Sequence, residues 1–292
     1  MLNKDSVIGV SSRSFCKSKY LRESLESNFK NVIYNEELLH FDEKALIKFF
    51  DNCQGIIVSE DIISVNVIDN LPNLKVVCKF GVGLDNIDTE YLKKKNIKLG
   101  WKPGLNSSSV AELALSYIIL MLREAYYLNR KMLNLKWEKV INSRDLTSST
   151  IGIIGFGHIG QKLASYLIPH ECNVLVFDPL LEINKDLSIN VRSTSLENVL
   201  KTCDAVSIHV PLNSKTKNLI GKKEIYMMKK GSVLINLARG EIVDESFLYE
   251  ALKNNHLCGA AFDVFANEPS NSNKFTSSLL DLENFFCTPH IA

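Results

Sequence analysis

The segment from residue 151 to 178 constrains the fold of this chain more than any other. An apolar run at 151–154 leads directly into the pattern Gly-x-Gly-x-x-Gly at 155–160, and a second apolar run at 172–177 ends at Asp178. A strand, a glycine-rich turn, a helix and a second strand that ends on an acid form one βαβ unit. A glycine pattern alone is a weak signal, but this complete arrangement predicts a dinucleotide-binding unit.

Each glycine has a mechanical role in such a unit. Gly155 allows the tight turn, Gly157 lets a pyrophosphate approach the backbone, and Gly160 lets the helix pack close to the strand. The phosphates would lie at a helix N-terminus, where free N–H groups and the dipole favour negative charge. Asp178 can accept hydrogen bonds from both ribose hydroxyls. It would repel a 2′-phosphate, and residues 179–181 offer no arginine to neutralise one, so we expect NAD as the cofactor.

The composition is that of an ordinary globular protein. Lys and Arg number 34 against 33 for Asp and Glu, so the net charge of +1 gives no reason to expect nucleic acid or an anionic membrane as a partner. The longest apolar stretch, 113–122, is too short to span a bilayer, and the six histidines include no pair at i,i+4 spacing that suggests a metal site. The seven scattered cysteines contain no Cys-x-x-Cys, which favours free thiols in a reducing compartment. We expect a cytoplasmic protein without a metal.

Two stretches of the chain alternate between β-rich and amphipathic runs, which favours parallel sheets covered by helices. In the first hundred residues the β-rich runs lie at 7–10, 55–58 and 74–78, and the amphipathic stretches at 20–29 and 43–53. From residue 150 the pattern restarts, with further strands expected at 205–209, 232–237, 259–262 and 285–287. We therefore expect an α/β protein with two domains, 1–100 and 101–292.

A long helical segment is predicted from about residue 107 to 135. Ser109 and Glu112 form a candidate capping box at its start, and residues 194–197 and Asp244 mark two later helix starts. The long segment is apolar on more than one face. We expect it to be buried between domains or between the subunits of a homodimer, and burial within one subunit is the alternative.

Three further segments follow strands of the second domain, where open α/β sheets bind their ligands. They carry an arginine, Arg239, a carboxylate, Glu268, and a histidine, His290. Arginine can hold a substrate carboxylate with two hydrogen bonds, and histidine can exchange a proton while a carboxylate orients it and raises its pKa. Taken singly, these residues also fit a surface ion pair and a structural histidine, and the sequence does not show that the three meet.

Together these motifs resemble those of the D-isomer-specific 2-hydroxyacid dehydrogenases, close to the phosphoglycerate-dehydrogenase-like branch, over almost the whole chain. The matching segments are Phe80-Gly-Val-Gly-Leu-Asp-Asn-Ile-Asp88, Ser109-Val-Ala-Glu-Leu-Ala-Leu, the glycine pattern, His209-Val-Pro-Leu212, Asn236-Leu-Ala-Arg-Gly-Glu-Ile-Val-Asp244, Asp263-Val-Phe, Glu268-Pro and Thr288-Pro-His290. The resemblance implies two Rossmann-like lobes, a flavodoxin-like substrate domain and a doubly wound NAD-binding domain, with the substrate between them. It also implies hydride transfer between NAD(H) and a 2-hydroxy acid / 2-oxoacid pair, with phosphoglycerate as one candidate.

The same resemblance implies roles for individual residues. Arg239 would bind the substrate carboxylate and 2-oxygen, His290 would be the general acid and base, and Glu268 would be its partner. Val82 and Gly83 would lie at the substrate and cofactor. The cofactor would contact Gly155, Gly157, His158, Ile159 and Gly160 at its pyrophosphate, Asp178 at its ribose, Val210 and Pro211 near the adenosine, Leu237 and Ala238 near the nicotinamide, and Asp263 at the carboxamide.

Two features depart from the family pattern. Lys79 fits one place where relatives that act on 3-phosphoglycerate hold the phosphate, although it also fits a plain solvated lysine. Glu60 and Asp61, at the end of the second predicted strand, would repel a phosphate, so the substrate stays open. Relatives also continue past the histidine with a helix that crosses back to the first domain, and we expect this element to be missing after Ala292.

Two other functions also stay open. Some relatives, the C-terminal-binding corepressors, use this fold as an NAD-gated binding module, and a chain without the crossing helix fits a catalytically weak truncated paralogue. The near-neutral charge and the lack of extended tails argue against the corepressor. Turnover of NADH with a panel of 2-oxoacids separates the three.

Overall fold

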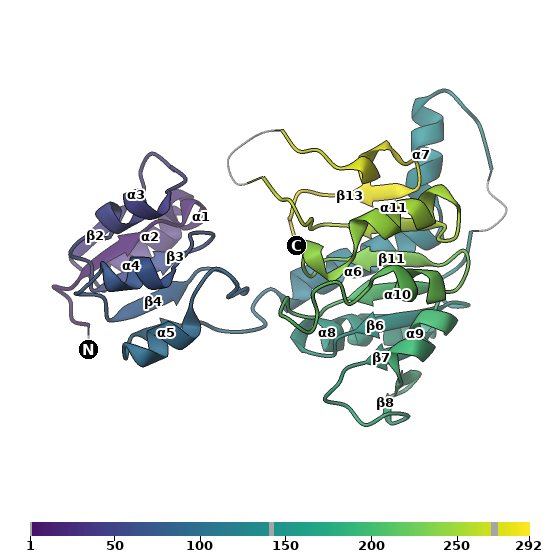
Figure 1. Cartoon of the computed structure of the whole chain (residues 1–292), viewed down its shortest axis with the longest axis horizontal. Coiled ribbons are helices and arrows are strands. Elements are labelled where there is room, and N and C mark those ends of the chain that lie inside the picture. The colour runs from purple at the N-terminus through teal and green to yellow at the C-terminus, as the bar shows by residue number, and fades with distance from the viewer. Residues whose placement is uncertain (1, 140–142, 270–273) are drawn as a thin grey trace. The chain divides into compact units, whose positions relative to one another are not determined.

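The computed structural model describes residues 2–139, 143–269 and 274–292. The chain divides into two units, Met1–Leu105 and Asn106–Ala292, which we call unit 1 and unit 2. Figure 1 shows unit 1 in purple and blue and unit 2 from teal to yellow. Each unit has its own hydrophobic core. The division follows Leu105, whereas the sequence predicts a boundary at residue 100.

Unit 1 is a five-stranded parallel sheet with the strand order β2-β1-β3-β4-β5. Its strands are β1 (Val7–Val10), β2 (Asn31–Tyr34), β3 (Gly55–Val58), β4 (Val76–Lys79) and β5 (Lys98–Gly100), and its helices are α1 (Arg13–Lys17), α2 (Lys19–Glu26), α3 (Glu43–Phe49), α4 (Val65–Asp69) and α5 (Thr89–Lys94). This order is that of flavodoxin-like folds. The predicted flavodoxin-like domain is therefore confirmed.

Short polar side chains start most helices of unit 1. Ser18, Asp42, Ser64 and Asp88 each accept a hydrogen bond from a backbone N–H in the first turn of α2, α3, α4 and α5. Each bond satisfies one of the donors that a helix leaves unpaired at its N-terminus. The apolar faces of α3 and α4 then pack on β3 to form the main core of the unit.

Unit 2 is an eight-stranded sheet with the strand order β13-β12-β11-β10-β6-β7-β9-β8, parallel except for the edge pair β8–β9. The strands are β6 (Thr150–Ile154), β7 (Asn173–Phe177), β8 (Asp186–Ser188), β9 (Val191–Ser193), β10 (Ala205–Ile208), β11 (Val233–Asn236), β12 (Gly259–Phe262) and β13 (Phe285–Cys287). The helices are α6 (Ser107–Leu122), α7 (Ala125–Leu133), α8 (His158–Leu167), α9 (Leu196–Thr202), α10 (Lys222–Met227) and α11 (Glu245–Lys253). The central strands run in the order of a doubly wound dinucleotide-binding fold, as predicted.

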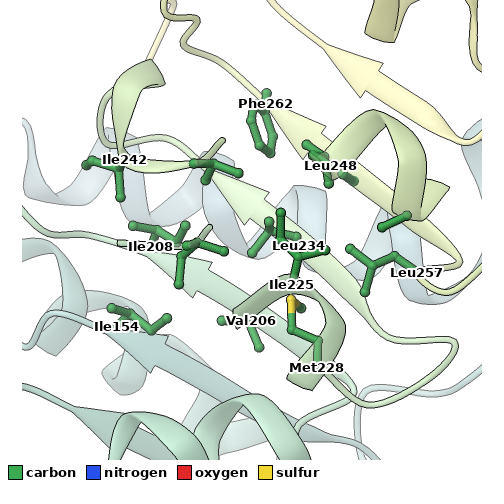
Figure 2. Close-up of a cluster of buried hydrophobic side chains, with 14 of the residues drawn as sticks. Ile154, Val206, Ile208, Ile225, Met228, Leu234, Ile242, Leu248, Leu257 and Phe262 are labelled. Carbon is green, nitrogen blue, oxygen red and sulfur yellow. The ribbon is translucent and has the colours of Figure 1, made fainter. Parts of the chain in front are cut away.

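Helices cover both faces of this sheet, so its strands are apolar at successive positions. In β6, Ile153 points to the core that is shared with α6 and α8, whereas Ile154 points to the core that is shared with α9, α10 and α11. Figure 2 shows the second core, where Ile154, Val206 and Ile208 from the strands face Ile225 from α10. Burial on both faces explains why these strands read as continuous apolar runs.

The predicted helix over residues 107–135 is two helices. α6 ends at Leu122, Glu124 adopts a left-handed conformation with φ +49°, and α7 then runs in a new direction from Ala125. The buried side chains of α6 lie in the core of unit 2, so this helix is buried largely within one subunit. Within the described ranges no helix is both long and apolar enough to cross a membrane.

Two of the predicted N-caps are wrong, although α6 begins at Ser107 as predicted. The N-cap of α6 is Asn106, and the Ser109 hydroxyl donates to the Asn106 carbonyl instead of capping the helix. The N-cap of α9 is Ser195, one residue after the predicted position, because its hydroxyl accepts from the Asn198 N–H. Asp244 caps α11 as predicted.

Candidate active site

The strand order of unit 2 reverses between β6 and β10, and open α/β sheets bind ligands beyond the carboxyl ends of their strands at such a point. The segments that follow β6, β7, β10, β11, β12 and β13 carry all of the predicted cofactor-binding and catalytic residues. The parallel sheet therefore places these segments, which are far apart in the sequence, at one edge of unit 2.

The three glycines after β6 have different surroundings. Gly155 has φ +96°, and a Cβ there would lie 2.6 Å from the His209 carbonyl oxygen. A Cβ on Gly160 would lie 2.1 Å from the Gly155 carbonyl oxygen. A Cβ on Gly157, the N-cap of α8, would meet nothing within 4 Å. The first and third glycines are thus required by the protein's own packing, whereas the space beside Gly157 is open at a helix N-terminus, where a diphosphate fits.

Asp178 connects the end of β7 to the glycine-rich turn. Its Oδ2 accepts from the Phe156 N–H at 2.8 Å, and its Oδ1 accepts from the Leu180 N–H at 2.9 Å. A carboxylate has about four acceptor positions, so two protein bonds leave capacity for ribose hydroxyls. The residue therefore orders the turn and presents a negative charge beside it.

His209 lies at this edge, directly after β10, and the sequence predicts no role for it. Its Nε2 lies 2.8 Å from the Ser207 hydroxyl, while its buried Nδ1 has no hydrogen-bond partner among the residues that the structure describes. Burial lowers the pKa of His209 to about 4, so the ring is neutral at pH 7. A buried nitrogen without a partner beside the glycine-rich turn fits a site that a polar ligand completes. The signal for it is a histidine directly after a buried strand.

The segment after β11 is held by the buried side chain of Asn236. Its amide donates to the Arg239 carbonyl at 2.9 Å and its Oδ1 accepts from the Ala238 N–H at 3.0 Å. Gly240 packs directly on the segment after β12, because a Cβ there would lie 1.9 Å from the carbonyl carbon of Phe265. This contact fixes the backbone of Arg239 beside the segment that carries Glu268. Neither Asn236 nor Gly240 is predicted as a site residue from the sequence.

The side chains of Glu268 and His290 are in contact, which the sequence alone could not show. Glu268 Oε2 lies 2.7 Å from His290 Nδ1, and its Oε1 accepts from the Phe265 N–H at 3.0 Å. The hydrogen bond with Glu268 raises the pKa of His290, against the opposing effect of burial. Burial alone would raise the pKa of Glu268, but the bonds from His290 and Phe265 outweigh it and lower that pKa. Because Nδ1 faces Glu268, Nε2 is the nitrogen that can exchange a proton with a substrate.

Asp263, at the end of β12, is fully buried. Its Oδ1 accepts from the Thr288 hydroxyl and from the Ile291 N–H, and its Oδ2 accepts from the Ala292 N–H. These bonds tie the segment after β13 to the end of β12. The predicted contact of Asp263 with a carboxamide stays a prediction, and the carboxylate has a second role in holding the backbone around His290.

The predicted substrate residues of unit 1 lie at the end of β4, which is Lys79, and in the segment that follows it. The Lys79 ammonium donates to the Ser59 carbonyl and to Asn86 Oδ1, the latter at 2.7 Å. The Val82 carbonyl accepts from the Trp101 ring N–H at 2.9 Å. Lys79 is thus engaged by its own unit, and the substrate roles of Lys79, Val82 and Gly83 stay predictions.

Comparisons with known proteins agree with this geometry. The sequence profile described as "D-isomer specific 2-hydroxyacid dehydrogenase, NAD binding domain" matches residues 115–292. A hydroxypyruvate reductase of Thermotoga maritima is 33% identical over 93% of this chain and 90% of its own length. A D-3-phosphoglycerate dehydrogenase of Bacillus subtilis is 35% identical over 93% of this chain, and the chain spans about half the length of that relative (50%).

A solved structure gives the same result. The D-lactate dehydrogenase of Aquifex aeolicus, in complex with NAD and lactic acid, matches 98% of this chain and 88% of its own with a TM-score of 0.82 and 29% identity. The predicted family, fold class and cofactor are therefore confirmed. The chain belongs to the family of NAD-dependent D-isomer specific 2-hydroxyacid dehydrogenases.

Proposed function

We propose that this chain interconverts a short, unphosphorylated 2-oxoacid and its 2-hydroxy acid, with Arg239, Glu268 and His290 as its catalytic residues. The observation that carries this proposal is the 2.7 Å contact between His290 Nδ1 and Glu268 Oε2 at the edge of the dinucleotide-binding sheet. A histidine whose pKa is raised by a carboxylate suits proton transfer near neutral pH.

The roles of the residues follow from their chemistry. Bound NADH supplies the hydride that reaches the carbonyl carbon of the oxoacid. His290, protonated and oriented by Glu268, gives a proton from Nε2 to the carbonyl oxygen and takes it back in the reverse direction. Arg239 binds the substrate carboxylate and stabilises the negative charge that develops on the oxygen.

The absence of a phosphate on the substrate is inferred from unit 1. Glu60 forms an ion pair with Arg13 at 2.7 Å, and Asp61 accepts from the Ser11 hydroxyl at 2.5 Å. The Lys79 ammonium is already held by Ser59 and Asn86. Arg13 and Lys79 thus bind partners within unit 1, and the carboxylates of Glu60 and Asp61 would repel a phosphate. The similarity to a hydroxypyruvate reductase over most of both chains supports the same substrate class.

Steady-state oxidation of NADH with glyoxylate, pyruvate, hydroxypyruvate and 3-phosphohydroxypyruvate tests this proposal. We expect turnover of the unphosphorylated acids, and a fall of about 10²–10⁴-fold in His290→Gln with NADH binding nearly unchanged. Wild-type turnover by His290→Gln would refute the catalytic role. A clear preference for the phosphorylated acid would refute the substrate class.

We also infer a homodimer and a cytoplasmic location. All seven cysteines are free, which suits a reducing compartment. The dimer is inferred from α7 and the residues that follow it, which we call the α7 arm (residues 125–137). Four large apolar side chains gather there within six positions and are 48–96% exposed, namely Met132, Leu133, Leu135 and Trp137. Such a patch is typical of a surface that a partner covers, and the partner we propose is a second copy of the chain.

A further inference from the structure

A series of hydrogen bonds through two hydroxyl groups and a carboxylate connects the core of unit 2 to the segment that carries His290. Tyr117 is a buried residue of α6, and its hydroxyl lies 2.5 Å from Oγ1 of Thr288. Thr288 in turn donates to Oδ1 of Asp263. Because the single hydroxyl proton of Thr288 is used by Asp263, Tyr117 is the donor in the first bond.

The last member of this series also holds the backbone of His290. The Asp263 carbonyl accepts from the His290 N–H at 2.8 Å, and its carboxylate accepts from the N–H groups of Ile291 and Ala292, both at 2.9 Å. His290 has φ +54°, a left-handed conformation that side chains rarely adopt. Strain of this kind persists only where surrounding bonds impose it, and it concentrates at functional sites.

The hydrogen-bonded series from Tyr117 to Asp263 begins on α6, a helix that also packs against the dinucleotide-binding helix. α6 packs along α8, the helix whose N-terminus follows Gly157, and the two helices share one core. Tyr166 of α8 also bonds to Glu112 of α6 at 3.3 Å. One helix therefore contacts both the dinucleotide-binding helix and the segment of the catalytic histidine.

We propose that Tyr117 is a positioning residue for proton transfer, whose hydroxyl sets the orientation of His290 through Thr288 and Asp263. This inference rests on the proposed function. In this role Tyr117 acts through Thr288 rather than through a contact with substrate or cofactor. Loss of its hydroxyl therefore affects the rate of the proton-transfer step more than the binding of either ligand.

Tyr126, at the start of α7, is a matched control. Like Tyr117 it is a tyrosine whose ring packs edge-on against Phe286, at 5.4 Å compared with 5.2 Å. Its hydroxyl also donates to the end of the sheet, but to the Phe285 carbonyl at the start of β13 rather than to Thr288. Tyr126→Phe thus removes a comparable hydroxyl group without breaking the series that leads to His290.

The experiment measures kcat, KM, the NADH dissociation constant and the solvent deuterium isotope effect for Tyr117→Phe, Tyr126→Phe, Thr288→Val and Thr288→Ser. We expect kcat to fall about 10-fold in Tyr117→Phe, with a larger isotope effect and little change in KM or in NADH binding, because a small misplacement of a catalytic group slows the step it serves. Tyr126→Phe should keep the wild-type kcat. Thr288→Ser, which keeps the hydroxyl, should rescue the loss that Thr288→Val causes.

A double-mutant cycle tests the route. If Tyr117 acts through Thr288, the variant with both Tyr117→Phe and Thr288→Val is no slower than Thr288→Val alone. Additive losses, or an equal fall of kcat in Tyr126→Phe, would overturn the positioning role. The variant His290→Gln separates this result from the proposed function. Turnover that survives His290→Gln overturns the proposed function. If His290→Gln is inactive but Tyr117→Phe keeps the wild-type kcat, only the role of Tyr117 is overturned.

Discussion

The ionisation of His290 depends on Glu268, and this coupling sets an expected pH dependence. In the proposed mechanism the reduction of a 2-oxoacid needs protonated His290, so we expect the rate to fall as the pH rises through the pKa of the imidazole. The hydrogen bond with Glu268 raises that pKa. Glu268→Gln removes the negative charge that stabilises imidazolium, so we expect the high-pH limb of the kcat/KM profile to move to lower pH.

Glu245 provides the control for this prediction. Its Oε1 accepts from the Ala266 N–H at 2.8 Å rather than bonding to His290, although its charge interacts with that of Glu268. We expect Glu245→Gln to move the limb much less than Glu268→Gln does. A limb that stays in place in Glu268→Gln would contradict the assigned pair, and equal shifts in both variants would show that net charge rather than the hydrogen bond controls His290.

Substitution by alanine should affect stability at one glycine of the site and NADH binding at another. A Cβ on Gly240 would overlap the backbone of Phe265 at 1.9 Å, so Gly240→Ala must displace the segments of Arg239 and Glu268. We expect it to lower both the melting temperature and turnover. A Cβ on Gly157 meets only open space, so Gly157→Ala should keep the melting temperature but weaken NADH binding. Calorimetry measures the melting temperature and fluorescence titration measures the NADH affinity. An unchanged NADH affinity in Gly157→Ala would show that the diphosphate binds elsewhere.

At the scale of elements, the end of β7 should decide the choice of cofactor. The Asp178 carboxylate stands beside the glycine-rich turn and would repel a 2′-phosphate. We expect the wild type to favour NADH over NADPH in kcat/KM, and Asp178→Ala to narrow this preference. The variant also loses the bond to the Phe156 N–H, so its affinity for NADH should fall as well.

A neighbouring acid tests whether position or charge matters. Asp186 lies on the edge strand β8, where it is exposed and 3.8 Å from Arg192. Asp186→Ala removes one negative charge of the same domain without touching the glycine-rich turn, and we expect it to leave the cofactor ratio unchanged. Equal or better use of NADPH by the wild type would show that Asp178 does not select the cofactor.

The elements that the sequence predicted well are those buried on both faces. Strands such as β3 and β12 were predicted with the observed bounds, because burial on two sides produces a short apolar run between polar turns. The edge strands β2 and β5 of the first sheet and the three-residue strands β8 and β9 were missed, because each of these short strands contains exposed positions. The break between α6 and α7 was also missed, because it depends on a left-handed Glu124 rather than on glycine or proline.

In the candidate site, too, some residues could be predicted from the sequence and others could not. Arg239, Glu268 and His290 could be named because their side-chain chemistry is visible in the sequence. Their supporting residues could not: Tyr117 reads as one more apolar position of a core helix, and Asn236 reads as the end of a strand. Their roles depend on contacts between segments up to 171 positions apart, which only the folded chain brings together.

At the scale of the whole molecule, assembly should depend on the α7 arm. The buried face of α6 is covered within unit 2, whereas the arm carries several large apolar side chains that are exposed close together in the sequence. Leu135 is 96% exposed and Trp137 is 81% exposed. Covering apolar surface yields roughly 25 cal/mol per Å², so these side chains can supply a large part of a dimer's stability.

We therefore expect light scattering at micromolar concentration to give twice the 32.9 kDa mass of one chain. The double variant Leu135→Ser/Trp137→Ser should shift the protein toward the monomer, because it removes apolar contacts without changing the core or the proposed catalytic residues. Ile189→Ser, at a position 74% exposed between β8 and β9, is the matched control and should stay dimeric. A monomeric wild type would refute the dimer, and a double variant as dimeric as the control would show that the copies pair through another surface.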